Sequence, residues 1–300
     1  MEYRQLGRNG PQVPAIALGA WPFGGAMGAV GEEVAVATVR SAIDRGITMV
    51  DTAQSYRASE RIVGRALAGG YRERCFLATK VSGDFSPRAI RAAIENSLRQ
   101  LAVDHVDLYQ IHGWNPEYPV EASMEAMERL RQEGKTRYIG VSNYNAAQMA
   151  LAMETAPFQS VQPGYNMLDR GIEAEDIPFC VEHGIGILAY SPLGQGLLTG
   201  RYRPGHRFAA DDYRSERAHF QGEQFARTVA IADRLAELAA DKGLSLVQLA
   251  IAWILRLPAI STVLVGAKNP GQLDDHLGAV GVRFSGDELE AIDAVLASAA

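Results

Sequence analysis

The chain has 300 residues, of which 47% are hydrophobic and 21% charged, and its formal net charge is −6. This length suits one large α/β domain or two ordinary ones. The acidic balance argues against nucleic acid as the main partner, because phosphate binding requires a basic face. The longest apolar run, residues 249–255, is too short to cross a bilayer. We therefore expect a globular protein that binds neither nucleic acid nor membrane.

The cysteine content predicts a reducing compartment. Cys75 lies in an apolar run, and Cys180 lies in a segment with helical character. Two thiols in a chain of this length are too few for a disulfide framework, so we interpret them as buried free cysteines. The polar residues 1–11 contain no apolar core of a secretory signal. Both observations favour a cytoplasmic protein.

Short and nearly continuous apolar runs recur along the chain, as is typical of strands buried on both faces of a parallel sheet. In chain order they occupy residues 15–21, 47–50, 75–80, 106–112, 138–143, 160–162, 185–191 and 261–266. Helical periodicity lies between these runs, most clearly at 86–101, where a serine cap and a proline open the segment. Further helices are predicted at residues 231–238, 246–257, 270–279 and 285–296.

Strands that alternate with helices at a spacing of about thirty residues form a chain of βαβ units. The eight runs predict one (β/α)8 TIM barrel domain over residues 1–300, with an open doubly wound sheet as the alternative. An N-terminal β-hairpin is expected at residues 3–14. A long Gly/Arg/Asp-rich loop follows the seventh strand at 192–224, and loops of this length are often functional lids. The wide gap between the seventh and eighth strands leaves room for extra helices.

Ionisable side chains stand at or just beyond the ends of several strands. In a parallel barrel the carboxyl ends of all strands meet at one rim, where active sites form. Taken singly, Asp51 could cap a helix, Lys80 could extend from the rim, and Tyr56 or His112 could pack in the core. Burying several ionisable groups together is costly unless they are paired. We therefore predict that these four residues form one catalytic site.

The chemistry of this group suits carbonyl reduction. A tyrosine phenol has a reference pKa near 10 and is a poor acid or base at neutral pH. A nearby Lys80 would lower the pKa of Tyr56, and Asp51 can keep that lysine charged. His112 can donate a hydrogen bond to a substrate oxygen. A cofactor must still supply the hydride.

Other chemistries lack their motifs in this sequence. There is no G-x-S-x-G elbow, no G-x-x-x-x-G-K-[ST] loop and no activating motif beside either cysteine. The six histidines form no H-x-x-x-H or H-x-x-H pair, so we expect no metal site. The glycine-rich residues 24–33 lack the G-x-G-x-x-G spacing of a Rossmann dinucleotide loop.

An ordered series of motifs resembles the aldo-keto reductase superfamily over nearly the whole chain. The motifs are DTAQSYRASE (51–60), ATK (78–80), DLYQIH (107–112), KTRYIGVSNYN (135–145), VQPGYN (161–166), AYSPLGQGLLTGRY (189–202) and VLVGAKNPGQLDDHL (263–277). They are similar to the bacterial, NADP(H)-dependent branch that includes potassium-channel β-subunit-like and general-stress-type members. The resemblance implies a (β/α)8 oxidoreductase without a Rossmann domain. Its partner would be a small carbonyl or alcohol: an aldehyde, a ketone or a sugar.

The resemblance also implies roles for individual residues. Tyr56 would be the general acid or base, tuned by Lys80 and Asp51, while His112 orients the carbonyl. Ser142, Asn143 and Gln162 would hold the nicotinamide carboxamide, and Tyr190 would stack on the ring. The pyrophosphate would lie along Ser191, Leu193, Gln195 and Gly196, with the long loop folded over it. The adenosine end would be surrounded by Gly266, Ala267, Lys268, Gln272, Asp275 and His276. Further cofactor contacts are expected at Ala20, Trp21 and Asp51.

The sequence departs from the family pattern at several positions. Arg57 stands where many relatives have glycine, and we interpret it as facing solvent, with an orientation into the pocket as the alternative. Trp114 follows Gly113 and is expected, with Trp21 and Arg57, near the substrate pocket. Lys268 replaces a frequent arginine and offers a 2′-phosphate a point charge instead of a bidentate fork. We therefore expect NADP(H) as the preferred cofactor, with NAD(H) as the alternative.

A second hypothesis assigns the same scaffold to an NADPH-binding sensor or regulatory subunit with vestigial turnover, as in potassium-channel β-subunits. The four catalytic residues do not discriminate between the hypotheses, because such subunits also keep them. The sequence leaves the oligomeric state open. The apolar, tryptophan-containing helix at 246–257 could belong to the core or to an interface, and we interpret it as core.

Overall fold

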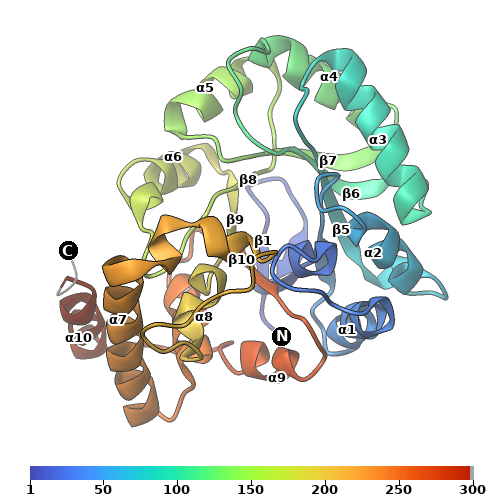
Figure 1. The fold of residues 1–300 in the computed structure, drawn as a ribbon. Coiled ribbons are helices and arrows are strands. Elements are labelled where there is room, and N and C mark those ends of the chain that lie inside the picture. The colour runs from blue at the N-terminus through green and yellow to red at the C-terminus, as the bar shows by residue number, and fades with distance from the viewer. Residues whose placement is uncertain (298–300) are drawn as a thin grey trace.

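The computed structural model describes residues 1–297, which form a closed barrel of parallel strands surrounded by helices (Figure 1). The order of strands around the barrel is β10-β3-β4-β5-β6-β7-β8-β9. The strand bounds are β3 (Ile16–Gly19), β4 (Met49–Asp51), β5 (Phe76–Val81), β6 (Val106–Ile111), β7 (Thr136–Ser142), β8 (Ser160–Gln162), β9 (Gly186–Tyr190) and β10 (Ile260–Gly266). Pairing of β10 with β3, as in Val263 opposite Ile16, closes the ring. The predicted (β/α)8 barrel is confirmed, and the doubly wound alternative is wrong.

Helices cover the outside of the barrel and follow the strands in turn (Figure 1). They are α1 (Glu32–Asp44), α2 (Ser59–Leu67), α3 (Pro87–Leu101), α4 (Val120–Gln132), α5 (Ala146–Thr155), α6 (Asp176–His183) and α8 (Leu246–Leu255). The predicted start of α3 is confirmed, because Ser86 accepts a hydrogen bond from the backbone of Ala89 and Pro87 is the first helical residue. Capping boxes begin α5 and α8 in the same way.

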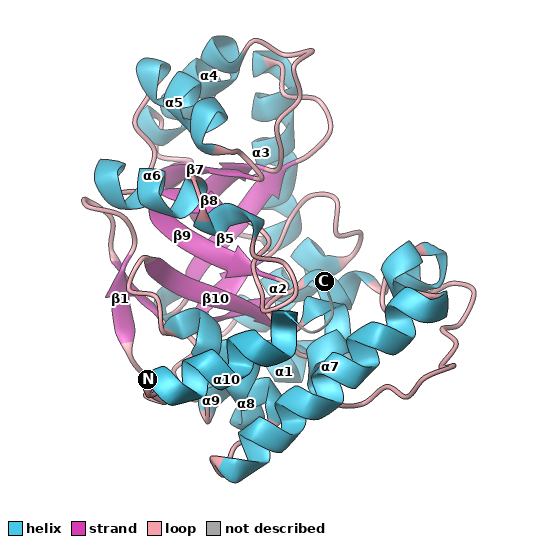
Figure 2. Ribbon diagram, turned by 90° about the vertical axis from the view of Figure 1, so that its left-hand side faces the viewer, coloured by secondary structure: helices cyan, strands magenta, loops and turns pink. Residues whose placement is uncertain are grey.

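The predicted N-terminal hairpin is present and closes one end of the barrel. Strands β1 (Tyr3–Gln5) and β2 (Gln12–Pro14) pair antiparallel, and Figure 2 shows β1 at that end. Leu6 and Val13 of this hairpin are fully buried against side chains of the barrel interior such as Leu108. The interior is therefore a packed core, and the amino-terminal end is plugged. Any site must form at the opposite rim.

The segment after β9 is more ordered than a long loop. It contains short 3-10 turns at Gly194–Thr199, Tyr213–Glu216 and Ala218–Phe220, and then enters the long helix α7 (Gly222–Asp241). The helix predicted at 231–238 is thus only the second half of α7. Its first turns bury Phe225 and Val229 against aromatic residues of the preceding segment instead of against the barrel. This non-local packing is why the apolar periodicity of the sequence located the helix too late.

The remaining helices complete the outer layer. The extra helices predicted between the last two strands are α7 and α8, and α10 (Gly286–Ala297) packs against α7. Helix α9 (Gln272–Leu277) is shorter than predicted, because residues 269–271 form a turn. Trp253 of α8 is 1% exposed, so the core interpretation of this helix is confirmed. Cys75 and Cys180 are buried free thiols, as expected.

Within the described residues, no single helix has the length and apolarity needed to span a membrane. Only α7 and α8 taken together pass by length and composition, and they meet at an angle of 85°.

Candidate active site

The predicted catalytic residues meet at the carboxyl-end rim of the barrel. Asp51 ends β4, Lys80 lies near the end of the adjacent strand β5, and His112 directly follows β6. Tyr56 lies in the turn after β4. Lys80 Nζ lies 2.5 Å from Asp51 Oδ1 and 3.5 Å from the hydroxyl of Tyr56, whose ring centroid is 5.5 Å from that of His112. The barrel geometry therefore brings together side chains that are distant in the sequence.

Lys80 is a fully buried cation with a complete set of protein partners. Its side chain is 0% exposed, and Nζ donates to Asp51 and to the carbonyl oxygen of Thr52 at 2.9 Å. Burial opposes the charged form and is the largest single influence, but the charges and hydrogen bonds of Asp51 and Tyr56 together outweigh it and raise the pKa of Lys80. The lysine is thus held as a cation beside the Tyr56 hydroxyl.

The carboxylate of Asp51 is fixed on both of its oxygens. While Oδ1 pairs with Lys80, Oδ2 accepts hydrogen bonds from Nε2 of Gln110 at 3.3 Å and of Gln162 at 3.0 Å. Gln110 was not predicted from the sequence. The available signal was a polar residue two positions beyond Leu108 in an otherwise apolar strand, which places both on the inner side of the barrel.

The pKa of Tyr56 shifts in the direction opposite to the expectation. Burial raises the pKa of Tyr56 above its usual value, and the charge of Lys80 lowers it without cancelling that effect. The sequence reveals the nearby lysine but not the loss of solvent around the phenol. The expected lowering of the Tyr56 pKa was therefore wrong for the protein without ligand. At neutral pH the phenol therefore keeps its proton.

His112 is neutral. Burial and the charge of Lys80 lower the pKa of His112 to about 3. Its backbone N–H donates to Val81 at 3.1 Å, and its carbonyl oxygen accepts from Asn143 Nδ2 at 3.1 Å. The ring presents Nδ1 to the Ser82 hydroxyl at 2.7 Å. A neutral, well-positioned imidazole can donate a hydrogen bond to a substrate oxygen.

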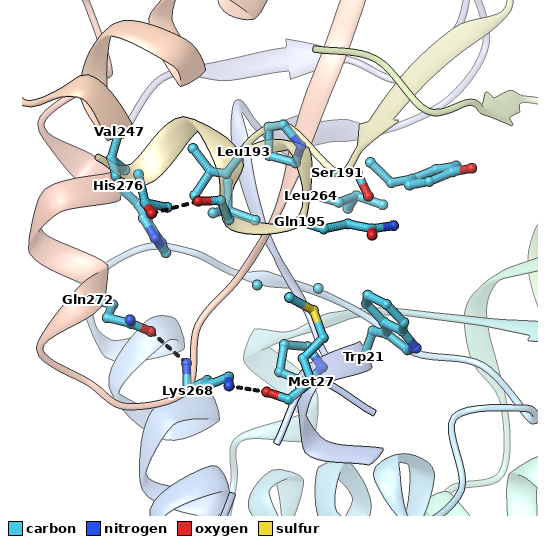
Figure 3. Close-up of a pocket in the computed structure, with 18 of the residues that line it drawn as sticks. Trp21, Met27, Ser191, Leu193, Gln195, Val247, Leu264, Lys268, Gln272 and His276 are labelled. Atoms are coloured by element: carbon cyan, nitrogen blue, oxygen red, sulfur yellow. Dashed lines mark hydrogen bonds between the residues drawn. The ribbon is translucent and has the colours of Figure 1, made fainter. Parts of the chain in front are cut away.

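A cavity of about 430 Å³ extends from Asp51 and Tyr56 to α9, whose residues Gln272 and His276 are seen in Figure 3; Lys80 and His112 do not line it. The sequence-predicted residues that line it are Trp21, Asp51, Tyr56, Gln162, Tyr190, Ser191, Leu193, Gln195, Gly196, Gly266, Lys268, Gln272, Asp275 and His276. The predicted cofactor residues outside the lining are Ala20, Ser142, Asn143 and Ala267. Three of these, Ala20, Ser142 and Ala267, are buried behind the wall.

Ser142 and Asn143 lie outside the lining but hold two of the lining residues in place. The hydroxyl of Ser142 donates to the carbonyl oxygen of Gln162 at 2.8 Å, and Asn143 Oδ1 accepts from the hydroxyl of Tyr190 at 2.9 Å. Asn143 adopts a left-handed backbone with φ 57°. These contacts fix the lining residues Gln162 and Tyr190 against β7.

The turn after β9 has several left-handed backbone conformations beside the cavity. Ser191, Gly194, Gln195 and Gly196 all have positive φ angles, of 55°, 54°, 56° and 103°. Two of its N–H groups are used within the turn, because Gly194 donates to the carbonyl oxygen of Ser191 and Gly196 to that of Leu193, both at 2.9 Å. The side-chain oxygen Oε1 of Gln195 is buried without a hydrogen-bond partner. A ligand with a hydrogen-bond donor would satisfy this oxygen.

The far end of the cavity carries a partly buried cation. Figure 3 shows Lys268 directed toward Met27, whose carbonyl oxygen accepts its hydrogen bond, while the Lys268 N–H donates to Gln272 Oε1 at 2.7 Å. Burial and the charge of Arg214 lower the pKa of Lys268. His276 is buried, and burial lowers its pKa to about 4. The residues predicted on one face of α9 therefore do share the cavity wall.

Residues 200–221, called the lid from here on, contribute Arg201, Tyr202 and Arg214 to the wall of the cavity. Within the lid, Arg214 makes a two-pronged ion pair with Asp212 at 2.8 and 2.6 Å and donates to the hydroxyl of Tyr202 at 2.6 Å. The Tyr213 N–H donates to the carbonyl oxygen of Ala26 at 2.9 Å across the groove. Charged and aromatic residues cluster in this segment, but their spacing does not predict these contacts. Lining residues that were not predicted include Arg201, Tyr202 and Arg214 of the lid and, outside it, Met27, Thr199 and Val247.

The residues expected around the substrate divide into different environments. Trp21 lines the cavity and meets Tyr213 of the lid edge-on, with ring centroids 5.5 Å apart. Arg57 is exposed, which agrees with the solvent-facing interpretation, and has φ 52°. That left-handed backbone explains why glycine suits the position. Trp114 does not line this cavity; it packs edge-on against Tyr144 at 5.1 Å.

Among residues 1–297, no group of three or more His, Cys, Asp or Glu side chains is arranged to hold a metal ion.

A model of the Aldo/keto reductase family matches residues 15–297. The chain belongs to this family. It is 36% identical to the aldo-keto reductase YhdN of Bacillus subtilis (strain 168) over 310 aligned residues, which cover 99% of this chain and 94% of the relative. It is also similar to the structure of the glycerol dehydrogenase AKR11B4 from Gluconobacter oxydans, with a TM-score of 0.89 and 35% identity over 99% of this chain and 95% of that chain. The predicted family membership is confirmed. This aldo-keto reductase is an oxidoreductase of a family that uses nicotinamide cofactors on small carbonyl compounds.

Proposed function

We propose that this aldo-keto reductase transfers hydride between NADP(H) and an aldehyde, ketone or sugar carbonyl, with Tyr56 as the acid in reduction and the base in oxidation. The observation that carries the proposal is the buried Lys80, which contacts both Asp51 and the hydroxyl of Tyr56, two residues that line the cavity. A buried ion pair of this kind, directed at one phenol, has little value for packing alone.

The protein residues would handle the proton and the developing charge. When bound, the nicotinamide cofactor supplies or accepts the hydride. In reduction, Tyr56 passes its phenolic proton to the substrate oxygen, and Lys80 stabilises the phenolate that remains. Neutral His112 donates a hydrogen bond to the same oxygen without giving up its proton. Positioned acid catalysis of this kind contributes about 10²–10⁴-fold in rate.

The cavity has features that fit an NADP(H) molecule. The turn at 191–196 leaves the buried Gln195 Oε1 without a donor, and Gln162, held through Nε2, keeps Oε1 for a carboxamide. Lys268 and Arg201 line the cavity, and the charge of Arg214 already disfavours the Lys268 cation. A 2′-phosphate would relieve that repulsion, so we infer a preference for NADP(H) over NAD(H).

The substrate is proposed as a small carbonyl or the matching alcohol. The structural neighbour is named as a glycerol dehydrogenase and the sequence relative as an aldo-keto reductase. Polyols and hydroxyaldehydes therefore belong in the first substrate panel. Neither name supports the alternative of a regulatory subunit with vestigial turnover.

The test is a spectrophotometric assay of purified protein with NADPH and NADH against aldehydes, ketones, sugars and, in the reverse direction, glycerol. Tyr56→Phe should lower turnover by about 10²-fold or more while NADPH affinity, measured by fluorescence quenching, stays within about threefold. Tyr3→Phe, in the exposed N-terminal hairpin, is the matched control and should leave turnover unchanged. Absence of turnover over the whole panel, or full activity of Tyr56→Phe, would refute the proposal.

A further inference from the structure

Two serine hydroxyls lie against one nitrogen of the catalytic histidine. Ser82 directly follows β5, and its Oγ lies 2.7 Å from His112 Nδ1. Ser55, in the turn before Tyr56, lies 3.4 Å from the same nitrogen, and its Oγ lies 3.1 Å from Ser82 Oγ, where it can accept the Ser82 proton. Neither serine has a place in the proposed proton transfer. Their convergence on Nδ1 therefore calls for a different role.

The hydrogen bond at Nδ1 decides what the opposite nitrogen can do. A neutral imidazole has one N–H donor and one lone-pair acceptor, and the partner of one nitrogen selects the tautomer. His112 is neutral because burial and Lys80 lower its pKa to about 3. Within residues 1–297, no protein group forms a hydrogen bond with Nε2. That nitrogen is left for the substrate.

We propose that the Ser82 hydroxyl donates its proton to Nδ1 of His112 and thereby keeps the imidazole proton on Nε2, where it can donate to the carbonyl oxygen. Ser82 is a positioning residue, because it acts through His112 and does not touch the reacting atoms. The catalytic meaning of this inference rests on the proposed function. The tautomer itself does not.

The other tautomer of His112, with the proton on Nδ1, would not support catalysis. If Nδ1 carried the proton and donated to Ser82, the Ser82 hydroxyl would turn to Ser55, and Nε2 would present a lone pair to the carbonyl oxygen. Two lone pairs would then face each other where a donor is required. Ser55 is exposed, so its hydroxyl can satisfy itself with water. The Ser82 hydroxyl has a single proton and two acceptors within reach, Ser55 Oγ at 3.1 Å and His112 Nδ1 at 2.7 Å, and the shorter contact is the one to Nδ1.

Nuclear magnetic resonance tests the tautomer directly. Protein labelled with ¹⁵N and ¹³C histidine would be examined at neutral pH, and the His112 signals assigned by their loss in His112→Gln. We expect the Nε2–H form in the native protein and in Ser82→Thr, which keeps the hydroxyl. Ser82→Ala should shift the population toward the Nδ1–H form, whereas Ser55→Ala should shift it less. A native Nδ1–H tautomer, or an unchanged tautomer in Ser82→Ala, would overturn the proposal.

Steady-state kinetics test whether the tautomer of His112 matters for carbonyl reduction. Ser82→Ala should lower kcat for carbonyl reduction roughly tenfold, with NADPH affinity within about twofold of the native value and recovery in Ser82→Thr. A shifted tautomer with unchanged kcat would refute the positioning role. Failure of the proposed function would be recognised separately. In that case the native enzyme would show no turnover, or Tyr56→Phe would keep full turnover, whatever the tautomer of His112.

Discussion

Replacing Asp51 by asparagine isolates the ion pair on which the site depends. The change keeps the size of the side chain but removes the counter-charge of Lys80, which is 0% exposed. Removing one partner of a buried pair costs about 3–5 kcal/mol, because the remaining charge is uncompensated. We therefore expect Asp51→Asn to lower the free energy of unfolding by about 3 kcal/mol at neutral pH.

The free energy of unfolding should depend on pH differently in the native protein and in Asp51→Asn. In the native protein the pKa of Lys80 is raised above its unfolded value, so its contribution to stability is complete through neutral pH and is lost only as pH rises through the folded pKa. Without Asp51, burial dominates and the folded pKa falls below the unfolded one. The unfolded chain then binds more protons, and the stability of the variant should rise with pH below about 10.

Urea denaturation at pH 6, 7.5 and 9 measures this difference. The double variant Asp51→Asn, Lys80→Met should recover most of the lost stability, because it removes both the charge and its burial cost. Glu33→Gln, which breaks an exposed ion pair with Arg65, is the matched control and should change stability by less than about 0.5 kcal/mol. A flat pH dependence for Asp51→Asn, or a double variant no more stable than the single, would refute the reasoning.

Three further outcomes are expected. Arg57→Gly should stabilise the protein by about 0.5–1 kcal/mol in denaturant titrations, because glycine adopts φ 52° without a Cβ clash; a loss of stability would contradict this. Lys268→Ala should raise the Kd of NADPH about tenfold or more and that of NADH less than threefold, as measured by calorimetry; equal effects on both would remove the 2′-phosphate assignment. The pH profile of kcat/KM for reduction should be flat from pH 5 to 8, since the pKa of His112 is about 3 and that of Tyr56 is raised; a break near pH 6.5 would contradict it.

The parts that the sequence predicts well are those controlled by local pattern. Buried strands appear as apolar runs, and the polar residues that end them point to the rim, so the barrel and the positions of Asp51, Lys80 and His112 could be inferred. The order of family motifs extended this inference to the cofactor residues. Gln110 was missed although its signal was present, because one polar residue in a buried strand has several explanations.

The lid could not be predicted because its contacts are not local. Arg214 finds its partners at Asp212 and Tyr202, and Tyr213 reaches Ala26 across the groove. Nothing in the spacing of these residues distinguishes such contacts from an exposed charged loop. The same limit explains the late start predicted for α7, whose first turns pack against the lid.

The pKa of Tyr56 shows why charge partners alone cannot define a catalytic group. Lys80 favours the phenolate, as the sequence suggested, yet burial of the phenol has the larger effect and raises its pKa. In the free enzyme Tyr56 is therefore protonated, which is the state required of an acid in carbonyl reduction. Oxidation of an alcohol would need the phenolate instead, so it should be favoured by higher pH. The fixed cation of Lys80 then has its main effect after the proton has left Tyr56, when the buried phenolate needs a counter-charge.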